Sequence, residues 1–372
     1  MIEKGKISSF QMAVMMYPTI IATAILVIPA ISAEAAGRDL WLSPFWALGT
    51  GFVTIAIAIK LHSYFPKETV IEYCPKIIGK VPGKIIGLLF LLFYLHINGV
   101  IIREYTDFVI GIFLMETPMI VVIASMVFVS ALAVRAGLEV LARTAEMFVP
   151  IVLFIIFVII VLLLSEIDFD NIFPIFEEGI TPSFLGALMP SSWYSEFFLI
   201  SFLLPYVANP NKALRWSVMS LLLISFSLMV TNLVVMLLFG LITEDLSYPL
   251  MSAARYISIA DFFENVEAVV MALWVAGAYV KIAVFYYALV IGTAQWLDLS
   301  NYRPVVFPIG MLLVIFGVWV TPTFTEMREL LGATSPVYLP FVQTLIPLFL
   351  LVVVIVKKRM RNRSQENEQV HS

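Results

Sequence analysis

Cysteine, histidine and charge are all scarce in this chain of 372 residues. Its one cysteine, Cys74, excludes a disulfide framework and a cysteine-ligated metal site. The three histidines, His62, His96 and His371, do not have the spacing of zinc ligands. Charged residues make up 13% of the chain and hydrophobic residues 61%, whereas a soluble domain has about 25% charged residues. A water-soluble fold is therefore excluded, and the formal net charge of −4 gives no indication of nucleic-acid binding.

Long hydrophobic runs fill most of the chain, and a helix that crosses a bilayer needs about 20 apolar residues. Lipid offers the backbone no hydrogen-bond partner, so each run is predicted to be a helix. The runs cover residues 10–32, 43–64, 84–102, 117–134, 144–165, 184–207, 213–242, 266–293, 304–322 and 335–356. We therefore predict an all-α polytopic membrane protein with one transmembrane domain at 1–356 and a basic, disordered cytoplasmic tail at 357–372.

The positive charges are sorted by side of the membrane. With the N-terminus placed inside, most of the 22 Lys and Arg residues fall on the inner side. The outer loops then hold only Arg38, Arg255 and Arg328. The positive-inside rule therefore predicts that both termini are cytoplasmic.

Ten spans divide into five plus five, and an odd number of spans makes the second half enter the membrane from the opposite side. We predict inverted repeats at about 10–165 and 184–356. Transporters built this way bind substrate at the membrane midplane, and Gly or Pro interruptions mark their discontinuous helices. Span 1 has Pro18 and Pro29, and span 6 has Pro190. Because proline removes a backbone donor, helices 1 and 6 are predicted to be discontinuous. Plain kinks, which are common in membrane helices, are the alternative.

Two charged residues stand out inside predicted spans. Glu196 in span 6 is a carboxylate near the bilayer centre, which is costly unless it is paired, protonated or next to a cavity. Lys281 lies deep in span 8, where Gly277 leaves room beside it. The two side chains can pair with each other, and such a pair either serves a ligand or locks two spans together. Alternatively, Lys281 takes the place of a sodium ion, or its stem runs toward the inner surface.

The remaining candidates are small or polar side chains around the two interruptions and on span 3. Tyr94 and Asn98 are spaced i, i+4 and share one face, where Asn98 suits an interhelical hydrogen bond. Arg103 and Asp107 have the same spacing and predict a surface salt bridge of little energetic weight. The full predicted binding set is Ala22, Thr23, Ala24, Tyr94, Asn98, Ser191, Ser192, Ser195, Glu196, Gly277 and Lys281. The sequence contains no nucleophile–base set and no phosphate loop, so we predict neither an enzyme nor a cofactor.

Several short segments, taken in order, resemble the permease-like B subunit of bacterial spore germinant receptors. They are Arg103-Glu104, Thr117-Pro118, the run 137–143, the run 173–180, Trp274, and Tyr279-Val280-Lys281. The resemblance covers almost the whole chain. It implies a branch of the amino acid–polyamine–organocation transporters in the inner membrane of the dormant spore, beside a larger membrane subunit of A type and a lipoprotein subunit of C type. It also implies that the protein senses nutrients rather than accumulates them.

The chain departs from this family pattern at both interruptions. Many relatives have glycines in span 1 where this sequence has Ala22 and Ala24, and a glycine before the span 6 glutamate where it has Ser195. Alanine favours a helix over glycine by about 1 kcal/mol, so span 1 unwinds less readily here.

The functional hypothesis is a germinant-sensing subunit that binds a small amino acid or a similar nutrient and signals to its partner subunits. The alternatives are a proton-coupled amino acid transporter and a water or ion conduit. Uptake of labelled amino acid and ion conductance distinguish the three.

Overall fold

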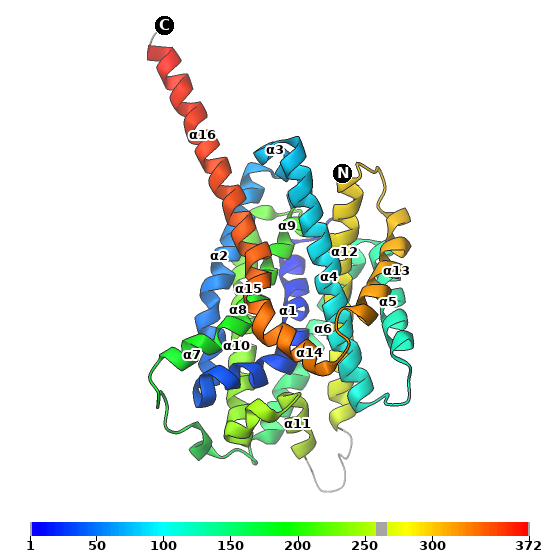
Figure 1. Cartoon of the computed structure of the whole chain (residues 1–372), viewed down its shortest axis with the longest axis vertical. Helices are drawn as coiled ribbons and strands as arrows, with labels where there is room; N and C mark the ends of the chain where they lie inside the picture. The colour runs from blue at the N-terminus through cyan, green and yellow to red at the C-terminus, as the bar shows by residue number, and fades with distance from the viewer. Residues whose placement is uncertain (1, 258–265, 371–372) are drawn as a thin grey trace.

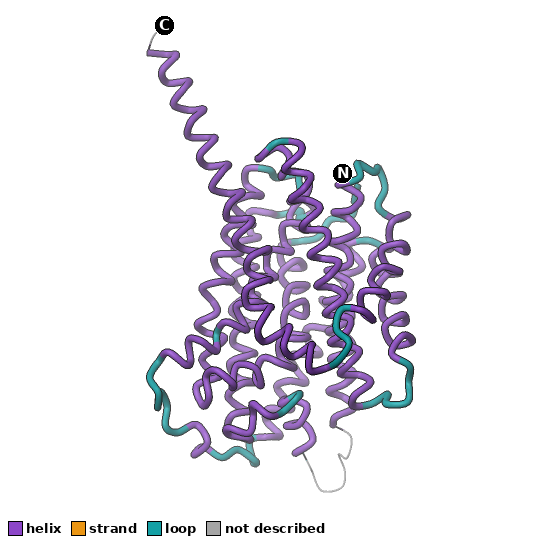
Figure 2. Tube along the Cα trace, in the orientation of Figure 1, coloured by secondary structure: helices purple, strands orange, loops and turns teal. Residues whose placement is uncertain are grey.

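Helices account for all the regular structure in residues 2–257 and 266–370, which are the parts of the chain that the computed structural model describes (Figure 2). Long helices run side by side in one bundle, and both termini lie at the same end of it (Figure 1). The long helices of the first half are α1 (Ser9–Ala36), α2 (Ser43–Tyr64), α4 (Lys80–Ile112), α5 (Met119–Ala136) and α6 (Leu138–Leu163), with the short α3 (Val70–Ile78) between α2 and α4.

The second half is more fragmented. Its elements are α7 (Thr181–Gly186), α8 (Leu188–Ser195), α9 (Ile200–Leu203), α10 (Ala213–Phe239), α11 (Pro249–Tyr256), α12 (Val266–Trp296), α13 (Arg303–Trp319), α14 (Phe324–Glu329), α15 (Ser335–Pro340) and α16 (Ile346–Val370). The last helices are joined through two π-helical turns, Leu330–Thr334 and Phe341–Leu345.

Seven helical stretches in the described ranges are long and apolar enough to cross a bilayer, and one of them, Ser9–Tyr64, contains both α1 and α2. Large apolar side chains cover the outside of the bundle, such as Phe154 and Phe157 on α6, which are 65% and 63% exposed. Water would penalise such a surface and lipid would not. The chain is therefore a multi-pass membrane protein, while the exact ten-helix inverted repeat stays a prediction.

The predicted interruption of span 1 is wrong. The helix α1 is continuous from Ser9 to Ala36, and it contains both Pro18 and Pro29. Ala22 and Ala24 lie between the two prolines, and alanine favours the α-helix more strongly than glycine does. Because α1 is buried along most of its length, neighbouring helices also hold it in place.

Span 6 is discontinuous, as predicted, but the change comes after Pro190. Pro190 lies in the first turn of α8, where its missing N–H is not needed. The α-helix ends at Ser195, and residues Glu196–Leu199 form a tighter 3₁₀ turn. The Ser195 hydroxyl donates to the Ser192 carbonyl oxygen at 2.6 Å, an interaction by which serine competes with regular helix. The change of helix type therefore falls at Glu196.

The chain beyond residue 356 differs from its prediction. The helix α16 continues through Lys357 and Lys358 to Val370, instead of ending in a disordered tail. Lysine, arginine, glutamine and glutamate are good helix formers, and here they extend a helix that the membrane segment has already nucleated. Residues 371 and 372 lie outside the described part.

Candidate functional site

An ion pair is buried where α1, α12 and the broken span 6 meet. The Lys281 ammonium lies 2.9 and 3.1 Å from the two carboxylate oxygens of Glu196 and 2.9 Å from the Thr23 hydroxyl oxygen. The exposed fractions of the three residues are 1%, 2% and 2%. We call Thr23, Glu196 and Lys281 the buried ion-pair cluster. Lys281 therefore pairs directly with Glu196, which is one of the interpretations that the sequence left open.

The buried ion-pair cluster lies at mid-height in the bundle. Thr23 is near the middle of the 28-residue α1, and Lys281 is near the middle of the 31-residue α12. Two charges at this depth have lost their hydration, and their mutual attraction offsets that loss only when all their hydrogen bonds are formed. The ammonium has three donors, and its three contacts use all of them.

Two aromatic side chains, those of Trp193 and Phe285, lie against the buried ion-pair cluster. The Trp193 indole N–H donates to the Thr23 hydroxyl oxygen at 2.8 Å, so this oxygen accepts from both Trp193 and Lys281. The Lys281 ammonium is 5.9 Å from the Trp193 ring centroid and 5.7 Å from that of Phe285. These distances allow cation–π attraction. Because Glu196 is buried in this conformation, a ligand can reach it only if surrounding side chains move.

A series of side-chain hydrogen bonds lies beside the buried ion-pair cluster. The Tyr94 hydroxyl donates to the Gln343 side-chain oxygen at 3.3 Å, and the Gln343 side-chain nitrogen donates to the Ser195 hydroxyl at 3.5 Å. Gln343 lies in the π-helical turn Phe341–Leu345, and such turns are frequent at functional sites. Since Ser195 directly precedes Glu196, these hydrogen bonds connect α4 and the last span to the cluster.

The other predicted residues make the following contacts in this structure. The Asn98 side chain donates to the Ile282 carbonyl oxygen at 3.3 Å, which is the interhelical hydrogen bond expected of it. A Cβ atom on Gly277 would lie 3.1 Å from the Ala22 Cβ, so these two positions allow α1 and α12 to approach closely. Ala24 is fully buried, and the Ser192 hydroxyl donates to the Leu188 carbonyl oxygen of its own helix. Ser191 is half-buried on α8.

Three residues of this region were missed by sequence reasoning: Trp193, Phe285 and Gln343. Gln343 had a usable signal, because an uncharged polar residue inside an apolar run commonly bonds a neighbouring helix. The predicted pairing of Arg103 with Asp107 is confirmed, but the bridge is not solvent-exposed. Their side chains do pair at 2.8 Å, but they are only 5% and 11% exposed, so this is a buried bridge and not a surface one.

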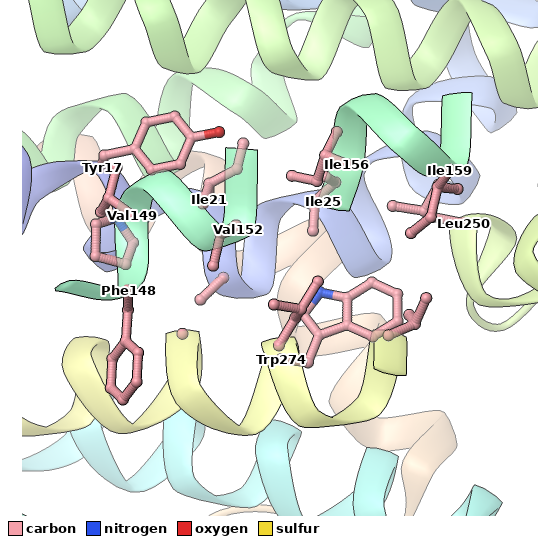
Figure 3. Close-up of a pocket in the computed structure, with 15 residues that line it drawn as sticks. Tyr17, Ile21, Ile25, Phe148, Val149, Val152, Ile156, Ile159, Leu250 and Trp274 are labelled. Atoms are coloured by element: carbon pink, nitrogen blue, oxygen red, sulfur yellow. The ribbon is translucent and has the colours of Figure 1, made fainter. Parts of the chain in front are cut away.

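A small apolar cavity lies beside the buried ion-pair cluster, between α1, α6 and α12. Its volume is about 40 Å³. Figure 3 shows side chains of α1 and α6 facing the ring of Trp274 on α12. Ala22 and Gly277 also line it, and each lies within one helical turn of a cluster residue. The site therefore combines a polar centre with an adjoining apolar cavity.

Solved structures of other proteins have a similar arrangement of helices. A sodium-coupled sialic acid symporter in a substrate-bound, outward-open state matches with a TM-score of 0.66 at 11% identity, covering 91% of this chain and 79% of the other. MhsT in complex with L-phenylalanine matches with a TM-score of 0.60 at 14% identity, covering 91% of this chain and 88% of the other. At these identities the likeness concerns the fold alone.

Sequence relatives are more specific. The spore germination protein KB of Bacillus subtilis (strain 168) is 26% identical, with 98% of this chain and 99% of the relative covered. The spore germination protein YndE of the same organism is 24% identical, with 95% and 98% covered. The spore germination protein XB of Bacillus anthracis is 22% identical, with 74% and 78% covered. The family model described as spore germination protein matches residues 6–325. The chain therefore belongs to the spore germination protein family.

Proposed function

We propose that this chain is the nutrient-sensing subunit of a spore germination receptor, and that it binds a small amino acid or a similar nutrient at mid-membrane. The observation that carries the proposal is the buried ion-pair cluster, in which Glu196 and Lys281 meet between spans 1, 6 and 8. Inverted-repeat transporters bind their substrates at the corresponding place.

An α-amino acid matches the chemistry of this cluster. Its ammonium group is able to replace the Lys281 ammonium at the Glu196 carboxylate, and its carboxylate is able to accept from the released Lys281. The exchange leaves every buried charge paired, which avoids the large penalty for an isolated ion. Ala22 and Gly277 adjoin the apolar cavity of about 40 Å³, which suits a small apolar side chain.

Ligand binding of this kind separates Lys281 from Glu196. It thereby moves α12 away from span 6. The bundle then has two arrangements, and a nutrient that binds one of them better shifts the population toward it. We propose that a larger membrane subunit of A type and a lipoprotein subunit of C type respond to this shift in the spore inner membrane, with both termini of this chain cytoplasmic.

The test is Glu196→Gln, which removes the negative charge with little change in volume. Spores carrying the variant should contain normal amounts of the protein and should not germinate with the nutrient that triggers the parent strain. Glu116→Gln is the matched control, because Glu116 is an exposed acid far from the cluster in sequence. An unchanged dose response in Glu196→Gln spores would contradict the proposal.

A proton-coupled amino acid transporter is the second candidate, and the transporter fold of the structural neighbours favours it. In that case Glu196 or Lys281 would carry the proton. Vesicles that contain this chain alone would then accumulate labelled amino acid when a pH gradient is imposed. The sensing proposal expects binding without accumulation in the same vesicles.

A further inference from the structure

Two pockets that share lining residues lie in the half of the bundle away from both termini, where α4 ends near α11 and α14 (Figure 1). We call the smaller one the inner chamber and the larger one the outer chamber. The inner chamber has a volume of about 20 Å³ and the outer chamber of about 620 Å³. Both chambers are lined by Asp107, Tyr248 and Phe324, while Glu104 lines only the inner one. We call the two chambers together the distal cavity.

Glu104 is a buried acid that forms no salt bridge among the described residues. It is 4% exposed, and its Oε1 atom has no hydrogen-bond partner in the part of the chain that is described. Lys281 attracts Glu104 electrostatically, but its ammonium donates to Thr23 and Glu196. Arg103 binds Asp107 and the carbonyl oxygens of Val318 and Pro322. A carboxylate left in this state is strongly unfavourable, so Glu104 requires a positive partner or a proton.

The two arginines that line the chambers do not supply that partner. Arg328, on the inner chamber, binds the Glu34 carboxylate and the Glu244 carbonyl oxygen, each at 2.6 Å. Arg255, on the outer chamber, pairs with Glu267 at 2.8 Å. The Oδ2 atom of Asp107 also has no partner among the described residues, so two acceptor atoms belong to this cavity.

The rest of the lining favours an organic cation over a metal ion. The Tyr248 ring lies 5.2 Å from the Phe108 ring and 5.9 Å from the Phe324 ring, measured between centroids. Aromatic faces attract ammonium groups. The remaining inner lining is largely aliphatic. Calcium takes six to eight oxygen ligands and magnesium about six, more than these two carboxylates provide.

We propose that the distal cavity binds the primary ammonium group of a small organic amine, with the Glu104 carboxylate as its counter-ion. The inner chamber holds one group of about the size of water, which matches an ammonium group, and the outer chamber holds the body of the molecule. Asp107 is the second acceptor, and Tyr248 and Phe324 line both chambers. This site goes beyond the mid-membrane nutrient site and shares no residue with the buried ion-pair cluster, although Glu104 interacts electrostatically with Lys281 and Glu196.

The test uses the full chain in lipid nanodiscs and labelled propylamine, which is an ammonium ion at neutral pH. The parent protein should bind it saturably, and Glu104→Gln should bind it about tenfold or more weakly, because a charge-assisted hydrogen bond is lost. Glu116→Gln, at an exposed acid outside the distal cavity, should bind as the parent does. Absence of saturable binding, equal affinity in Glu104→Gln, or equally strong competition by potassium chloride would overturn the proposal.

A second measurement covers the case in which Glu104→Gln does not fold. Ser247 is exposed and lines both chambers, and the native Cys74 is buried. Propylamine should slow the reaction of Ser247→Cys with a cationic thiol reagent, and it should not affect Ser63→Cys, whose position is also exposed. Equal reaction rates with and without propylamine at Ser247→Cys would overturn the proposal.

Discussion

Replacing Lys281 by methionine should strongly destabilise the protein. Methionine has a similar length and no charge, so the change removes the ammonium and leaves the Glu196 carboxylate buried. Three hydrogen bonds between charged or polar groups are lost, and each hydrogen bond to a charged group contributes about 1.5–3 kcal/mol. The variant no longer has to bury an ammonium, which offsets part of this loss. The expected net decrease is about 3–5 kcal/mol, as for other buried pairs from which one partner is removed.

The double variant Lys281→Met with Glu196→Gln tests the cause of that loss. Both charges are then absent, so the double variant should be more stable than Lys281→Met alone, with a coupling energy of about 1–3 kcal/mol. Unfolding free energies are measured by SDS titration in mixed micelles. Lys67→Met is the control, since Lys67 is exposed, and it should change stability by about 0.5 kcal/mol or less. A loss below about 1 kcal/mol in Lys281→Met, or simple additivity in the double variant, would refute the reasoning.

Three further predictions concern other contacts. Thr23→Val removes the oxygen that accepts from Lys281 and Trp193, so spores should need a higher nutrient concentration for half-maximal germination, and an unchanged dose response would contradict this. Gly277→Leu has to push α12 from α1 and should lower stability by about 1–3 kcal/mol, whereas Gly49→Leu, where nothing lies within 4 Å of an added Cβ, should not. Burial raises the pKa of the Glu72 carboxyl above its ordinary value of 4.5. The folded protein therefore binds the Glu72 proton more tightly than the unfolded chain does, and stability should fall as the pH rises from 4.5. Glu72→Gln should flatten this part of the profile of melting temperature against pH, and an unaltered slope would contradict the prediction.

The amino-acid sequence by itself determined the class of the protein and the position of its main charged residues. Hydrophobic runs of membrane length predict helices because lipid leaves the backbone no other partner. The same physics singles out Glu196 and Lys281, since a charge inside such a run has to be compensated. Their pairing was one of the interpretations that the sequence allowed. For α1, in contrast, the prediction from the sequence was wrong. Two prolines predicted a break, but alanine propensity and burial keep the helix continuous.

Only the tertiary structure decided which polar side chains meet. Gln343 reaches Ser195 and Tyr94 because a π-helical turn changes its direction and because three helices converge there. Trp193 covers Thr23 across a separation of 170 residues, which no local pattern encodes. The isolation of Glu104 has the same origin. Its neighbour Arg103 is directed to Asp107 and to two backbone carbonyls at and just after the end of α13. The packing of α4 against that segment, not the order of residues, leaves Glu104 without an ion-pair partner among the described residues.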